Sequence, residues 1–288
     1  MKTFRPFLVI SAALLGAAIA SAQFGGLDLG KLKKGLDTAK DAGKILKGVT
    51  GIGPEEERNM GEAVALELIG KYGGVVRDET ISKRVNLVGR TLGLYSDRPQ
   101  LNWRFAVLDS DTVNAFSAPD GYVFITKALY AQATSDDLLA AILSHEIAHV
   151  TGKHALNIVA RNDAFGALTK QMSERSGNAR QADAVLKQLN LSTDLILKTL
   201  LEKGFDPQTE FAADLTGHNL AATCGYAPGG LRAVLVHLQE QGGDGKKVFV
   251  THPPLADRIK RLPNEPAPAP AELIANADAK DKPVGEAK

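Results

Sequence analysis

The chain has 288 residues, of which 44% are hydrophobic and 23% are charged, and its formal net charge at pH 7 is +1. This composition is that of a globular protein with one or two hydrophobic cores. There is no basic stripe or nucleic-acid-binding motif, so we expect no nucleic-acid partner. The single cysteine, Cys224, excludes an internal disulfide.

The first 22 residues predict a cleaved export signal. Lys2 and Arg5 give a charged start, an apolar run follows over 7–20, and Ala20-Ser21-Ala22 matches an A-x-A cleavage site. The apolar run is short of the roughly 20 residues that a membrane-spanning helix needs. We therefore expect an exported protein in the periplasm of a Gram-negative bacterium, with secretion or membrane association as the alternatives.

The two ends of the mature chain have unusual compositions. Residues 23–54 are rich in glycine and lysine, and within them 27–50 could form an amphipathic helix that touches a membrane surface peripherally. The glycines weaken such a helix, which favours a loosely ordered lead-in. Residues 263–288 are rich in proline, alanine and charge and are predicted to be disordered.

Residues 55–262 are predicted to form one mainly helical α+β domain. Helices are expected over 54–72 and over 78–96, the second capped by Asp78. Two stretches rich in aromatic and β-branched residues, 102–111 and 121–130, predict strands that pair as antiparallel neighbours. The segment between them, which ends in Pro-Asp-Gly, is interpreted as a turn.

The second half of the domain is predicted to be helical. A long apolar helix is expected over 136–162, and further helix over 163–204 with an interruption near 173–181. Asp206-Pro207 begins another helix. Two more helices are expected at the end of the domain, over 228–243 and 255–262.

The long apolar helix carries His145-Glu146-x-x-His149, a pattern that can hold zinc. The histidines are four residues apart, so both project from one face, where two imidazoles can bind one Zn²⁺ at roughly 2.0–2.1 Å. Glu146 can reach a water molecule at the zinc and take its proton, as in a metalloprotease. An ordinary surface helix is the alternative, but the apolar neighbours predict a buried one, where charged side chains require a reason.

The residues directly after His149 could contain a third ligand. Gly152 fits the template H-E-x-x-H-x-x-G-x-x-H, but the third histidine would then replace Ala155, and His154 comes one residue early. If the helix continues, His154 lies about 180° around the axis from His145. We therefore expect His154 to be a surface residue or a neighbour of the site.

A carboxylate further along the chain is the better third ligand. Glu210 and Asp214 are one turn apart and share a face of their predicted helix. Glu210 could complete a site of two histidines and one glutamate. Asp214 could accept a hydrogen bond from a ligand histidine and fix its tautomer. An exposed acidic pair would have the same spacing, and His218 is a rival ligand or a neighbour.

His252 precedes Pro253-Pro254, which hold it in a stiff, non-helical segment. A histidine held near a zinc site could donate a hydrogen bond to the oxyanion of a tetrahedral intermediate. It could instead cap the open metal position and keep an enzyme latent. Taken without its context, it is an ordinary loop histidine.

Together these stretches resemble the HtpX-like and BepA-like gluzincin metallopeptidases, a family with mitochondrial and CAAX-processing relatives. The resemblance covers about residues 55–262 and rests on four stretches in the family's order: VNAFSAPDGYVFITKALY, LLAAILSHEIAHVTGKHAL, EFAADLTG and THPPLADRI. It implies a small sheet beside a helix that carries H-E-x-x-H and a second helix that carries the glutamate ligand.

The resemblance also implies roles for individual residues. One Zn²⁺ per chain would be held by His145, His149 and Glu210, with Glu146 as catalytic base. Asp214 would contact a ligand histidine, and His252 would lie in the cleft near the metal. The strand over 122–126 resembles the strand beside the family's cleft, to whose edge an extended polypeptide substrate could add. The residues implied in substrate binding are Asn114, Phe116, Tyr122, Val123 and Phe124.

We therefore expect a zinc metalloendopeptidase that hydrolyses peptide bonds of exported or envelope proteins, with a part in protein quality control. The alternative is a latent or non-catalytic, chaperone-like module that binds unfolded envelope proteins. The intact Glu146 favours the enzyme, because structural zinc does not need that carboxylate.

Overall fold

The computed structural model describes residues 52–162, 178–242 and 252–265, with the backbone alone for 178–186. Within these ranges the chain is mainly helical with one three-stranded sheet, which confirms the predicted fold class. The predicted export signal, the lysine-rich segment 27–50 and the tail from 266 lie outside the described residues. Among the helices of the described ranges, none is both long and apolar enough to cross a membrane.

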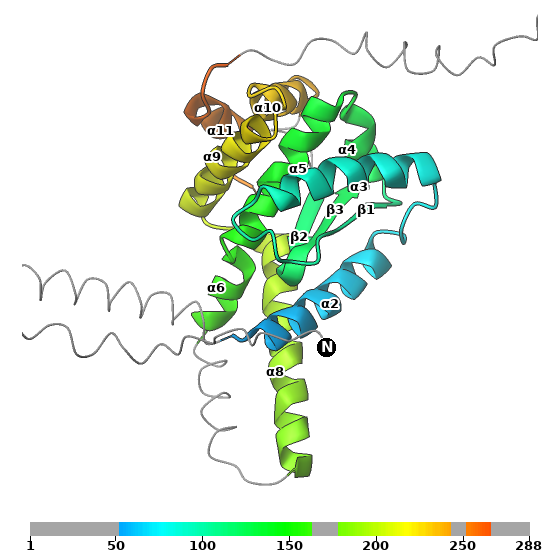
Figure 1. The fold of residues 1–288 in the computed structure, drawn as a ribbon. Helices are drawn as coiled ribbons and strands as arrows, with labels where there is room; N and C mark the ends of the chain where they lie inside the picture. The colour runs from blue at the N-terminus through cyan, green and yellow to red at the C-terminus, as the bar shows by residue number, and fades with distance from the viewer. Residues whose placement is uncertain (1–51, 163–177, 243–251, 266–288) are drawn as a thin grey trace, which may run out of the picture. The chain divides into compact units, whose positions relative to one another are not determined.

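The elements follow one another along the chain as coloured in Figure 1. The helices are α2 (Pro54–Lys71), α3 (Glu79–Leu94), α4 (Lys127–Gln132), α5 (Asp136–Thr151), α6 (His154–Ala160), α8 (Asn178–Lys198), α9 (Pro207–Thr223), α10 (Gly230–Glu240) and α11 (Leu255–Arg261). Two short helical turns, η1 (Pro119–Gly121) and η2 (Thr199–Lys203), lie between them. The strands are β1 (Arg104–Leu108), β2 (Ala115–Ala118) and β3 (Tyr122–Thr126).

Local sequence signals set the ends of several helices. The Asp78 carboxylate accepts a hydrogen bond from the Ile81 amide at 2.9 Å and caps α3, as predicted. Asp206 caps α9 in the same way, through the amides of Gln208 and Thr209. The first predicted helix ends before Gly73, which has φ +82°.

The sheet differs from the prediction. Its strand order is β1-β3-β2, with β1 parallel and β2 antiparallel to β3. The predicted antiparallel pairing of the strands now labelled β1 and β3 is therefore wrong, because the segment interpreted as a turn contains β2. That strand folds back onto β3 through Pro119–Gly121, where Asp120 and Gly121 have φ of +61° and +87°. β3 is thus the central strand, and β2 is an edge.

The side chains of the sheet alternate between two hydrophobic clusters. Val123 and Ile125 face a cluster built with α3, α5 and α10, whereas Phe124 and Phe116 face a second cluster built with α2 and α8. The helix α5 lies against β2 and β3 and also packs on α3, α9 and α10 (Figure 1). Every residue of α5 from Leu139 to Val150 is buried, as expected for a helix that is surrounded by other elements on all its faces.

The long helix predicted over 136–162 is broken in the structure. α5 ends at Thr151, Gly152 forms its C-cap, and Lys153 adopts a left-handed conformation with φ +53°. A second helix, α6, then begins at His154. The apolar pattern continues through this break, so periodicity alone does not reveal it. Of the further helix predicted over 163–204, the part from 178 to 203 is helical and the part from 163 to 177 lies outside the described residues.

Candidate metal centre

The close approach of α9 to α5 brings the predicted ligands together. The contact is made at Gly217, where an added Cβ would lie 2.8 Å from the backbone nitrogen and Cα of His145. Real Cβ atoms do not approach backbone so closely. A glycine in α9 therefore sets the separation between the helix of the two histidines and the helix of the glutamate.

Replacing Gly217 with alanine is expected to push α9 away from α5. The free energy of unfolding should fall by about 1–3 kcal/mol, as for other overpacked cores, and zinc should bind less tightly because Glu210 moves relative to His145. Urea denaturation and chelator competition measure the two effects. Gly70→Ala in α2 is the control, because an added Cβ there meets nothing within 4 Å. Equal stability of both variants would contradict the expectation.

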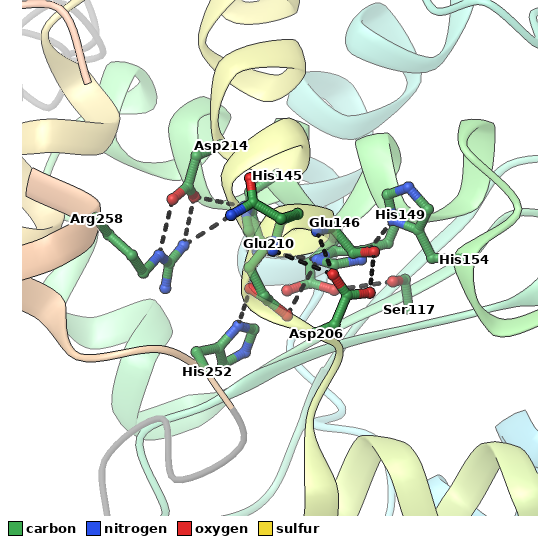
Figure 2. Close-up of polar contacts among 12 residues, drawn as sticks. Ser117, His145, Glu146, His149, His154, Asp206, Glu210, Asp214, His252 and Arg258 are labelled. Atoms are coloured by element: carbon green, nitrogen blue, oxygen red, sulfur yellow. Dashed lines mark hydrogen bonds and ion pairs between the residues drawn. The ribbon is translucent and has the colours of Figure 1, made fainter. Parts of the chain in front are cut away.

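His145, His149 and Glu210 lie together as the sequence predicts, and all three are buried (Figure 2). One donor atom from each lies within 4.8 Å of the others. The two Nε2 atoms are 3.2 Å apart, and the Glu210 oxygens lie 3.7 Å from His145 Nε2 and 3.8 Å from His149 Nε2. Two imidazole nitrogens and a carboxylate oxygen are a donor set that suits zinc.

Glu210 supplies a further sign that a cation belongs here. Its side chain is fully buried, and its Oε1 has no hydrogen-bond partner within the described residues. Burial would raise the pKa of this carboxyl, but His252 and the two other histidines outweigh it and hold that pKa well below its usual range. A buried anionic oxygen without a donor is costly unless a cation is bound. The residues present therefore fit a zinc ion.

His145 is held from behind by an ion pair. Its Nδ1 lies 3.0 Å from Asp214, as predicted, and Arg258 of α11 donates two hydrogen bonds to that carboxylate, at 2.6 and 2.9 Å (Figure 2). Burial would raise the pKa of Asp214, but Arg258 holds it well below its usual range. For His145 the effect of burial has the opposite sign and would lower the pKa, but the hydrogen bond to Asp214 outweighs it, and the pKa of His145 is raised. This support directs the Nε2 lone pair of His145 towards the other ligands.

Glu146 is buried and held by a residue that sequence reasoning missed. The Ser117 hydroxyl on β2 donates a hydrogen bond to Glu146 Oε2 at 2.9 Å. The carboxylate is thus fixed beside the candidate ligands without belonging to them. Ser117 lies in the short stretch AFSA, which carries no recognisable pattern of its own.

Two further rings contact His149: Phe205, which was not predicted there, and His154, for which a place beside the site was one of the two expectations. Phe205 stacks on His149 with ring centroids 4.5 Å apart and an interplanar angle of 19°. His154, placed by phase on the opposite side of the helix, instead lies with its Nδ1 2.9 Å from His149 Nδ1. The phase argument failed because the helix does not continue past Thr151. Burial lowers the pKa of His149 well below its usual value, which favours the neutral form that binds metals.

His252 and His218, the remaining candidates, differ in position. His252 Nδ1 lies 2.5 Å from Glu210 Oε2, and its ring centroid is 5.6 Å from that of His145 (Figure 2). His218 is buried on α9, but its Nε2 lies 3.8 Å from Glu265 and it does not belong to the group of candidate ligands. A rival ligand role for His218 finds no support.

The cleft beside the candidate ligands is narrow. Its cavity volume is about 10 Å³, room for about one water molecule. The lining residues include Phe116, Glu146, Leu200, Phe205 and His252. The predicted edge strand needs correction, because Tyr122, Val123 and Phe124 belong to the central strand β3, which is paired on both sides. Asn114 immediately precedes β2, which is an edge strand, and Phe116 lies on β2.

Comparison with known proteins agrees with this geometry. A family model described as peptidase family M48 matches residues 79–265. The β-barrel assembly-enhancing protease of Escherichia coli K12 is 24% identical over 220 residues, which are 75% of this chain and 45% of that protein. The mitochondrial metalloendopeptidase OMA1 of Schizosaccharomyces pombe is 24% identical over 211 residues, 72% of this chain and 60% of that one.

The corresponding OMA1 protein of Arabidopsis thaliana is 26% identical over 190 residues, which are 65% of this chain and 36% of that protein. The matches thus span 36–60% of the length of these three relatives. The family model, in contrast, covers α3 to α11 and includes every candidate ligand. The chain therefore belongs to peptidase family M48.

Proposed function

We propose that this protein is a zinc-dependent endopeptidase. One observation carries the proposal: Glu146 is buried and held by Ser117 directly beside the group His145, His149 and Glu210. A metal that only stabilised the fold would not need an oriented carboxylate that stays out of the ligand set. The test is casein cleavage by the purified full-length chain, compared with Glu146→Gln protein that carries the same amount of zinc.

Each polar residue of the centre has a task in peptide hydrolysis. When bound, zinc supplies a Lewis acid that polarises the scissile carbonyl and acidifies a water molecule. Glu146 takes a proton from the attacking water and later delivers it to the leaving amine. Ser117 keeps the Glu146 carboxylate in place, and Asp214 with Arg258 keeps the His145 ring in one orientation.

We further propose that an extended polypeptide binds along β2. Its residues Ala115 and Phe116 line the cleft, and β2 is an edge of the sheet to which another strand can be added. Exported or envelope proteins are the proposed substrates, with quality control as the proposed role. The predicted export signal supports this, as does the name of the E. coli relative, which refers to β-barrel assembly. A periplasmic location is proposed on the same grounds.

The narrow cleft indicates that His252 restrains the site. The cavity has room for about one water molecule, so we infer that a lining residue moves when a substrate enters, and His252, which is hydrogen-bonded to Glu210, is one of these residues. Replacing His252 with alanine is therefore expected to raise the initial rate of casein cleavage. Glu146→Gln/His252→Ala protein, which should remain inactive, controls for a contaminating protease.

The opposite outcome has an equally definite meaning. A fall in the casein cleavage rate of about 10²–10³-fold in His252→Ala protein would assign oxyanion stabilisation to His252. Such a fall would contradict the proposal that His252 restrains the site. Zinc content is measured in the same samples, because the hydrogen bond between His252 and Glu210 could also support metal binding.

A further inference from the structure

His154 reaches His149 through a turn built from two residues. Gly152 ends α5, Lys153 reverses the chain at φ +53°, and His154 is the first residue of α6. The turn returns the His154 ring to the preceding helix, where its Nδ1 lies 2.9 Å from His149 Nδ1. The two rings meet almost at right angles, with an interplanar angle of 82°. This is the geometry of a hydrogen bond between imidazoles rather than of stacked rings.

The contact determines where the protons lie. A neutral imidazole carries one N–H, so His149 can offer its Nε2 lone pair to a metal only if its proton is on Nδ1. The Nε2 atom faces His145 and Glu210, so Nε2 is the metal-facing atom. His149 Nδ1–H must then donate to His154 Nδ1, and His154 must carry its own proton on Nε2. Each ring fixes the tautomer of the other.

Neighbouring residues keep the His154 ring in this place. An added Cβ at Gly152 would lie 2.4 Å from His154 Nε2, so the ring occupies the space that any larger residue would need. Phe205 stacks on His149 and meets His154 edge-on, with centroids 5.8 Å apart and an interplanar angle of 62°. Phe205 thus covers a face of the His149 ring, and His154 meets its Nδ1 edge.

We propose that His154 is a positioning residue, which accepts the Nδ1–H of His149 and thereby selects the tautomer and ring plane in which His149 binds the metal. The inference rests on the proposed metal site and extends it. The two ligand histidines then have unlike supports, because the corresponding atom of His145 faces the Asp214 carboxylate, which is paired with Arg258. The His154 imidazole orients the His149 ring as the Asp214 carboxylate orients the His145 ring, but it adds no negative charge to the site.

Zinc affinity of the full-length protein tests the proposal directly. His154→Ala removes the acceptor and is expected to raise the zinc dissociation constant by about 10–100-fold, measured by chelator competition. His154→Asn can place its Oδ1 near the position of the lost Nδ1, so it should restore most of the affinity. His237→Leu, which alters an exposed histidine on α10, controls for the loss of a histidine elsewhere. Equal weakening in the alanine and asparagine variants would contradict an acceptor role.

Gly152→Ala tests the same contact without changing either histidine. The φ of Gly152 is −72°, which alanine adopts freely, and the atoms nearest to an added methyl group are those of the His154 ring. The variant should weaken zinc binding on its own. It should weaken it no further in a His154→Ala background, because both changes remove one interaction. Additive losses would show that Gly152 and His154 act separately and would overturn the proposal.

The tautomers can also be observed in the wild-type protein. Two-bond ¹H–¹⁵N correlation spectra of the zinc-loaded chain should show His154 protonated at Nε2 and unprotonated at Nδ1. A proton on His154 Nδ1, or an unchanged zinc affinity in His154→Ala, would overturn the inference. Zinc affinity and tautomer are measured without substrate, so a failure here is distinguishable from a failure of the proposed peptidase activity.

Discussion

Replacing Glu146 with glutamine is expected to abolish casein cleavage while the protein keeps its zinc and its thermal stability. Glutamine has the same shape, and its amide oxygen can still accept the hydrogen bond from Ser117. It cannot take a proton from water, and removal of a general base lowers rates by about 10²–10⁴-fold. Cleavage is measured as soluble peptide release, zinc by metal analysis and stability by thermal unfolding.

The same variant separates the enzyme from the chaperone-like alternative. If the protein only binds unfolded clients, Glu146→Gln protein should hold them as wild type does, and wild type should release no peptides. Undiminished casein cleavage by pure Glu146→Gln protein would contradict the assigned mechanism. Ser117→Ala is a useful companion variant, because it leaves the carboxylate in place and removes only the group that orients it. Its activity should lie between those of the other two proteins.

Replacing Arg258 with methionine is expected to lower the free energy of unfolding by about 3–5 kcal/mol, because it leaves a buried carboxylate without its partner. Asp214 and Arg258 are 3% and 1% exposed, so water cannot replace the lost hydrogen bonds. The Asp214 carboxylate is also the support of His145, so zinc affinity should fall by about 10–100-fold. Urea denaturation and chelator competition measure the two losses.

The ion pair of Arg98 and Glu57 provides a matched control for Arg258. Arg98 donates two hydrogen bonds to Glu57, at 2.7 and 2.9 Å, and this pair is also largely buried. Arg98→Met should destabilise the fold to a similar degree while zinc affinity stays unchanged. The hydrogen bonds of Arg98 and Glu57 join them to each other, to the Val150 carbonyl and to the Asp120 amide, and not to a candidate ligand. An equal loss of zinc affinity in both variants would mean that Arg258 acts only through global stability.

The metal-facing part of the centre could be predicted from the sequence because helical spacing determines it. His145 and His149 share a face by their separation, and Glu210 and Asp214 share one for the same reason. The supporting residues could not be predicted in this way, since they come from other elements. The sequence contains one indication of the role of Arg258. This residue falls on the apolar stripe formed by Leu255 and Leu262, where a buried cation requires a partner.

The errors in the fold have physical causes. β2 was missed because alanine and serine have weak strand propensities, and its loss made the strands on either side look like a simple antiparallel pair. His154 was misplaced because helix phase applies only to an unbroken helix. The turn at Lys153 depends on a left-handed backbone conformation that lysine seldom adopts, and nothing in the local sequence requires it.

Arg258 lies 113 residues beyond His145 in the chain, which has a consequence for biosynthesis. A ribosome adding about 5–20 residues per second needs about 6–23 s to synthesise those residues. During this interval the nascent polypeptide already contains the zinc motif but lacks the helix that anchors Asp214. The ion pair that supports His145 can therefore form only after Arg258 has been synthesised, so the proposed peptidase is least capable while the chain is still emerging.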